Sequence, residues 1–236
     1  GLTMDAKPPV VLASGQLLTA AFWDPLVEAL GARFAFIEAD HTQDETIAGM
    51  AERLLAGAPE RFDLVAHAMG GFTAFEVMRR APERVRSLAL LSTLAPNDGP
   101  AQTERRQGYI RLVEDGNFQG VVDERVPILL HPGRRGDPRL VSLIRSMAME
   151  TGAETFLRQQ RAIMGRIDSR PSLAAIRCPT LLVRGREDAI ASAAHQQEML
   201  EAIPGARLEE IAECGHLVTL ERPDETARIL GGWLAR

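Results

Sequence analysis

The chain has 236 residues, 45% hydrophobic and 25% charged, with a formal net charge of −5. This length fits one α/β domain with a small insertion. The mildly acidic balance, without a block of Lys or Arg, argues against nucleic acid and anionic membranes as partners. No apolar run approaches the roughly 18 residues of a membrane span. Residues 1–3 resemble a tag remnant and no signal pattern follows, so we expect a cytoplasmic protein.

The predicted elements alternate between short apolar strands and amphipathic helices. In chain order we expect strand 10–13, helix 22–30, strand 34–37, helix 46–56, strand 62–66, helix 71–80 and strand 85–91. After a different middle segment, strand 180–183, helix 193–203, strand 207–211 and helix 223–234 follow. This alternation predicts an α/β fold with a mostly parallel sheet flanked by helices.

The middle of the chain has helical periodicity and few β-branched clusters. Helical spacing is visible at 109–113, 140–149 and 155–164, and prolines and glycines such as Pro127 and Gly133 interrupt it. We therefore expect a core formed by residues 1–95 and 173–236, with a helical cap insertion at 96–172.

The stretch "LVAHAMGGFTAFEVMRR" at 64–80 predicts a sharp strand-turn-helix hairpin. Such a hairpin lifts the residue at its tip above the carboxyl end of the strand, and small residues must flank the tip because the two backbones pass closely. Ala68 occupies the tip, with Ala66 two residues before it and Gly70 two residues after it. Taken alone, this pattern favours an ordinary glycine-rich turn over a catalytic one.

The first strand ends in Ser14-Gly15-Gln16, a turn that suits an oxyanion site. A glycine at that point allows the next amide to point into a crevice. The backbone N–H groups of Gln16 and of Met69, just after the hairpin tip, could together bind a developing negative charge. A turn that only begins a helix explains the same residues equally well.

An acid and a histidine follow the last two predicted strands. Asp188, with Glu187 as a neighbouring candidate, comes after strand 180–183, where a carboxylate could orient an imidazole or simply cap a helix. His216 follows Gly215 after strand 207–211 and could act as general base and acid. The order of hairpin tip, acid and histidine is the one that an α/β-hydrolase requires.

On these motifs the chain resembles the α/β-hydrolase superfamily, in the branch of small esterases that includes pimeloyl-carrier-protein methyl esterase and the enol-lactone hydrolases. The resemblance covers essentially the whole chain and is carried by "LASGQLLTAAFW", "FDLVAHAMGGFTAFEVMRRAPERVRSLALLST", "IRCPTLLVRGREDAI" and "ECGHLVTLERPDE". It implies Asp188 as the orienting acid, His216 as the base, Gln16 and Met69 as oxyanion donors, and Ala68 at the nucleophile position.

The sequence departs from the family pattern at three positions. Ser14 stands where the family usually has His, and Ala66 replaces the first glycine of the hairpin, a tolerable change between small residues. Ala68 removes the attacking oxygen. One explanation is that the natural protein carries serine here, with alanine substituted to prevent turnover. Alternatively, the protein is a binding module, or His216 and Asp188 act without a serine, as in a lyase or a cofactor-free oxygenase.

With serine at position 68, the resemblance implies hydrolysis of a small-molecule ester, thioester or lactone through an acyl-enzyme. Candidate substrate-binding residues share an apolar character that suits an acyl or alkyl group, although ordinary core packing is the simpler explanation for any one of them: Leu17, Leu18, Leu94, Leu129, Met147 and Leu217. Arg105-Arg106 and Arg134-Arg135 could meet an anionic substrate, but each pair is more typical of a solvated loop. No metal or organic cofactor is implied, and the oligomeric state is not indicated.

Overall fold

A computed structural model describes residues 7–236, so the tag-like residues 1–3 lie outside the described part. A sheet of six parallel strands forms its centre, in the order β2-β1-β3-β4-β5-β6. The strands are β1 (Val10–Ala13), β2 (Phe36–Glu38), β3 (Phe62–His67), β4 (Val85–Leu91), β5 (Thr180–Gly185) and β6 (Arg207–Ile211). The predicted fold class is confirmed.

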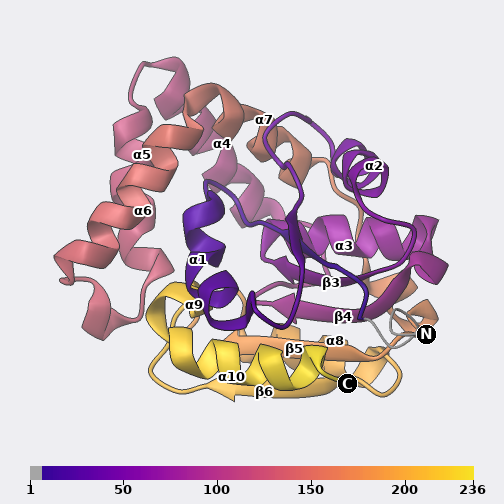
Figure 1. The fold of residues 1–236 in the computed structure, drawn as a ribbon. Coiled ribbons are helices and arrows are strands. Elements are labelled where there is room, and N and C mark those ends of the chain that lie inside the picture. The colour runs from indigo at the N-terminus through magenta and orange to yellow at the C-terminus, as the bar shows by residue number, and fades with distance from the viewer. Residues whose placement is uncertain (1–6) are drawn as a thin grey trace.

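Helices cover both faces of the sheet (Figure 1). One face carries α1 (Ala20–Leu30), α9 (Val218–Glu221) and α10 (Pro223–Leu234), and the other carries α2 (Ile47–Gly57), α3 (Met69–Arg80) and α8 (Ala193–Ala202). Successive side chains of a strand point to opposite faces. In β1, Val10 and Leu12 accordingly join the first apolar cluster, and Val11 and Ala13 join the second. Burial on both faces explains why the strands read as continuous apolar runs.

Four helices lie between β4 and β5, inside the predicted insertion, and Figure 1 shows them gathered on one side of the molecule. They are α4 (Pro100–Glu114), α5 (Phe118–Leu129), α6 (Pro138–Thr151) and α7 (Ala153–Met164). Their aromatic residues Tyr109, Phe118 and Phe156 belong to the same apolar cluster as α1. The sequence does not predict helix α5, because Pro127 is typical of an interruption, whereas the structure places it inside the last turn of this helix.

The loops after the strands converge at the carboxyl edge of the sheet. The chain leaves β1 for β2 on one side and returns to β3 on the other, which opens a crevice at that edge. At Gly185, the end of β5, an added Cβ would lie 2.1 Å from the carbonyl oxygen of Gly215. The loops that carry Asp188 and His216 are therefore packed backbone against backbone.

This contact predicts the effect of a methyl group at position 185. Gly185→Ala is expected to lower the free energy of unfolding by about 1–3 kcal/mol, because backbone atoms cannot move aside as a flexible side chain can. Gly232→Ala is the matched control, since nothing lies within 4 Å of its added Cβ and it sits in α10, where alanine favours the helix. Urea denaturation measures both. Equal stabilities for the two variants would contradict the packing described.

His41, in the loop after β2, joins three parts of the molecule. Its ring Nε2 hydrogen-bonds with Thr73 Oγ1 of α3 at 3.0 Å, and its carbonyl accepts a hydrogen bond from Gln159 Nε2 of the cap helix α7 at 3.0 Å. Burial lowers the pKa of His41 to about 4 from the usual 6.5. The ring is therefore neutral in the folded protein at pH values where it takes a proton in the unfolded chain.

Folding stability is consequently expected to fall as the pH drops from 6.5 toward 4. In that range the unfolded state binds the His41 proton and the native state does not, which costs about 1.4 kcal/mol per pH unit for this residue. The His41→Gln variant is expected to lose less free energy of unfolding per pH unit, by the contribution of one proton. This difference in slope does not depend on the variant's own stability at pH 7. Thermal or urea unfolding between pH 5 and 7 measures the slope, and identical slopes for both proteins would contradict the assignment.

Candidate active site

Ala68 lies at the tip of a tight turn between β3 and α3, with φ 49° and ψ −111°. Residues other than glycine rarely adopt this conformation, which costs about 1–3 kcal/mol and persists only where the surroundings enforce it. Here the Ala68 amide donates to Leu91 O at 2.9 Å, and Thr93 Oγ1 donates to Ala68 O at 2.7 Å. A Cβ at Gly70 would lie 2.1 Å from Ala13 O. Glycine is thus required at the start of α3.

Asp188 and His216 form a buried pair. Nδ1 of His216 lies 3.1 and 3.0 Å from the two carboxylate oxygens, and one of these oxygens also accepts the amides of Ile190 at 2.8 Å and Ala191 at 3.0 Å. Burial raises the pKa of Asp188, but His216 and the hydrogen bonds outweigh it, so the pKa lies below its ordinary value. The ionised carboxylate accepts a hydrogen bond from Nδ1–H of the imidazole and so fixes the orientation of the ring. In the neutral ring, Nε2 then carries the lone pair that can accept a proton.

The neighbouring candidate, Glu187, has a different environment. Its carboxylate accepts the amide of Cys214 at 3.1 Å, which ties the loop after β5 to the loop after β6. Of the two acids weighed from the sequence, Asp188 is therefore the one that contacts the histidine ring.

Two further side chains hold the backbone on either side of His216. The buried carboxylate of Glu221 accepts the amides of Gly215 at 3.1 Å and Leu217 at 3.0 Å. Nε2 of His67 donates to His216 O at 2.8 Å. Burial, followed by the proximity of His216, lowers the pKa of His67 to about 3, so its ring is neutral. The sequence indicates no role for His67, whereas in the structure its hydrogen bond to His216 O supports the loop that carries His216.

The turn after β1 is fastened to the cap. Leu17 has a φ of 60°, and its amide donates to Gln159 Oε1 at 3.1 Å, while Gln16 Nε2 donates to Gln160 Oε1 at 2.8 Å. Ser14 Oγ accepts Nε1–H of Trp23 at 2.8 Å. Within residues 7–236, the backbone amides of Gln16 and Met69 donate to no protein acceptor. These are the two amides that were proposed from the sequence to bind an oxyanion.

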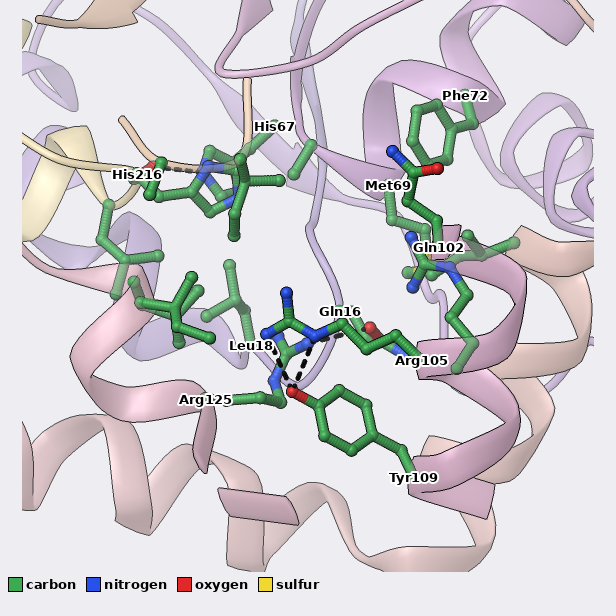
Figure 2. A pocket seen from close by; sticks show the side chains of 18 residues that line it. Gln16, Leu18, His67, Met69, Phe72, Gln102, Arg105, Tyr109, Arg125 and His216 are labelled. Atoms are coloured by element: carbon green, nitrogen blue, oxygen red, sulfur yellow. Dashed lines mark hydrogen bonds between the residues drawn. The ribbon is translucent and has the colours of Figure 1, made fainter. Parts of the chain in front are cut away.

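A cavity of about 230 Å³ brings these elements together (Figure 2). Its wall includes several residues named from the sequence: Gln16, Leu18, Ala68, Met69, Leu129, His216 and Leu217. Asp188 does not line the cavity. It contacts Nδ1 of His216, which does.

Three residues proposed for the pocket lie elsewhere. Leu17, whose φ is 60°, borders a smaller void between the β1 turn and the cap. Leu94 packs against an apolar cluster that includes Met69 and Phe72, and Met147 is buried on the inner face of α6.

The cap contributes polar residues to this cavity that were missed or interpreted otherwise from the sequence. Gln102, Arg105, Arg106 and Tyr109 come from α4, and Arg125 comes from α5. The sequence leaves Arg105 and Arg106 open between contact with an anionic substrate and a solvated pair; in the structure both line the cavity, with Arg105 exposed and Arg106 half-buried. The apolar residues one turn to either side of Arg125 were a usable signal, because they put that arginine on the inward face of a helix.

Arg134 and Arg135 do not line this cavity. Arg134 contacts Glu213 O, and Arg135 Nε donates to Pro127 O at 2.7 Å. Within the described residues, no group of three or more His, Cys, Asp and Glu side chains is placed to hold a metal ion. In the same part of the chain, no helix is long and apolar enough to cross a membrane.

Comparison with known proteins identifies the family. The model of the alpha/beta hydrolase family matches residues 10–229. A "Putative carbamate hydrolase RutD" from Azorhizobium caulinodans is 31% identical over 97% of this chain and 91% of its own length. A pimeloyl-[acyl-carrier protein] methyl ester esterase from Nitrosomonas europaea is 25% identical over 92% of each chain.

Among solved structures, a thermophilic esterase from Thermogutta terrifontis with malate bound superposes with a TM-score of 0.88. It is 26% identical, over 97% of this chain and 89% of that one. The resemblance noted from the sequence motifs is thereby confirmed, and the chain belongs to the α/β-hydrolase family.

Proposed function

We propose that this protein is a hydrolase of carboxylic esters, thioesters or lactones that works through an acyl-serine, and that Ala68 replaces the serine. The observation that carries the proposal is the strained backbone at Ala68. An alanine gains nothing from that conformation, whereas a hydroxyl placed there would face the cavity that His216 also lines. On this proposal, the present chain binds its substrate but does not form the covalent intermediate.

With serine at position 68, the chemistry follows from the groups around it. Nε2 of His216 takes the hydroxyl proton while the oxygen attacks the substrate carbonyl. The amides of Gln16 and Met69 hold the resulting oxyanion, and Asp188 stabilises the protonated imidazole. Collapse of the intermediate expels the alcohol, which takes the proton from His216. Water, deprotonated by the same ring, then releases the acid and regenerates the serine.

The relatives support hydrolysis without identifying the bond. Their names cover a carbamate hydrolase, a methyl ester esterase and an esterase. The cavity of about 230 Å³ is smaller than the roughly 300–1,000 Å³ of sites for drug-sized ligands, which favours a small substrate. Short esters, thioesters, lactones and carbamates therefore make the appropriate panel.

Restoring the oxygen tests the proposal. Ala68→Ser is expected to raise ester hydrolysis by at least roughly a thousandfold, because removal of a nucleophile from an otherwise complete triad has losses of that order or more. Initial rates on the panel are measured for both proteins.

In the Ala68→Ser background, Asp188→Asn is expected to reduce the rate by roughly 10³- to 10⁴-fold, because the imidazole then lacks its orienting carboxylate.

The other outcomes separate the alternatives left open by the sequence. Binding of panel compounds with no hydrolysis by either protein would favour a binding module. Comparable turnover by both proteins would favour a base-catalysed reaction in which His216 and Asp188 act without serine.

A further inference from the structure

Two arginines in the cavity have no acidic partner among the described residues. Arg105 donates to the hydroxyl of Tyr109 at 3.1 and 2.9 Å, and Nη1 of Arg125 donates to Gln16 Oε1 at 3.2 Å. By contrast, Arg106 forms an ion pair with Asp98, which also pairs with Arg166. Figure 2 shows Arg105 and Arg125 beside Tyr109, with His216 on a different wall of the cavity.

The cavity wall as a whole is positively charged. Of its 18 residues three are arginines, and none is an aspartate or glutamate. Burial is the main cause that lowers the pKa of Arg125 to about 10 from the usual 12.5; Tyr109 opposes this shift, and the charges of Arg106 and Arg105 contribute to it. The guanidinium is therefore still charged at neutral pH. Charged groups withdrawn from water in this way are normally paired with an opposite charge.

We propose that the cavity binds substrates that carry an oxyanion, such as a carboxylate, at the end remote from the bond that is hydrolysed, with Arg105 and Arg125 holding that group. A guanidinium matches such an oxyanion with two parallel hydrogen bonds. This inference rests on the proposed function for the position of the scissile bond. The substrate class it names is half-esters of short dicarboxylic acids, or their phosphonate analogues.

The small volume limits the length between the two groups. Arg125 contacts the side chain of Gln16, whose backbone amide is the proposed oxyanion donor. The anionic group would thus lie near the cap end of the same turn that receives the scissile carbonyl. A linker of a few methylene groups fits about 230 Å³, and a long acyl chain does not.

Calorimetry with the present Ala68 chain tests the inference without any turnover. The ligands are monomethyl succinate, glutarate and adipate, each compared with the neutral primary amide of the same shape. A phosphonate of the glutarate length separates a carboxylate preference from a phosphate preference. At least one half-ester or the phosphonate is expected to bind roughly 10- to 100-fold more tightly than its neutral counterpart.

Arg125→Gln is expected to abolish most of this preference while changing the affinity for the neutral amide less than about threefold. Arg125→Lys keeps the charge and is expected to retain part of the preference. Arg111→Gln is the matched control, an exposed arginine of α4 that does not line the cavity. Circular dichroism and thermal unfolding check each variant, and if Arg125→Gln is unfolded, Arg105→Gln takes its place.

Equal affinity for charged and neutral ligands, or no measurable binding of either, would overturn the inference. So would a loss of affinity in Arg125→Gln that is the same for both ligands, because a purely structural role predicts that result. The proposed function is tested by a separate result. An inactive Ala68→Ser protein with an intact charge preference rejects the esterase proposal alone, and an active one without the preference rejects the anionic subsite alone.

Discussion

At the carboxyl edge of the sheet, several backbones approach one another so closely that no side chain fits between them. Gly70 lies against the carbonyl of Ala13, and Gly185 lies against the carbonyl of Gly215. Each contact fastens one loop of the site to another. The position of Ala68 and the position of His216 are therefore set by the same packed layer, and the site has little freedom to rearrange when a substrate enters.

Buried polar side chains next to this layer hold the same loops in place by hydrogen bonds. Asp188 is held by two amides and holds the imidazole, while Glu221 and His67 hold the backbone on either side of that histidine. Each buried carboxylate thus has several donors, as burial requires. So much supporting structure around a position that carries only a methyl group is difficult to explain by packing alone. It is the physical reason for treating Ala68 as a missing oxygen.

The core and the order of the candidate residues were predictable from the sequence because they depend on local signals. A buried parallel strand is a short apolar run, and the residue just after it must lie at the carboxyl edge, so Asp188 and His216 could be placed with no knowledge of long-range contacts. The strained turn at Ala68 was predictable from the small residues on either side of it.

The cap was less predictable, because the inward face of each helix depends on how the helices pack together. The sequence does not predict α5 or the place of Arg125, because Pro127 is typical of a helix end and here lies inside the helix. Met147 and Leu94 had the right chemistry for a pocket but face apolar clusters. The cap residues that line the cavity are therefore the part of the candidate site that needed the structure.

The most direct measurement of the central claim is covalent labelling of the Ala68→Ser protein with a fluorophosphonate, read by intact mass and peptide mapping. A serine at this position, activated by His216, attacks phosphorus and expels fluoride. The account predicts a single adduct, formed rapidly on the serine introduced at position 68, and none on the present chain. Absence of an adduct on that serine, or equal labelling of both proteins, would contradict it.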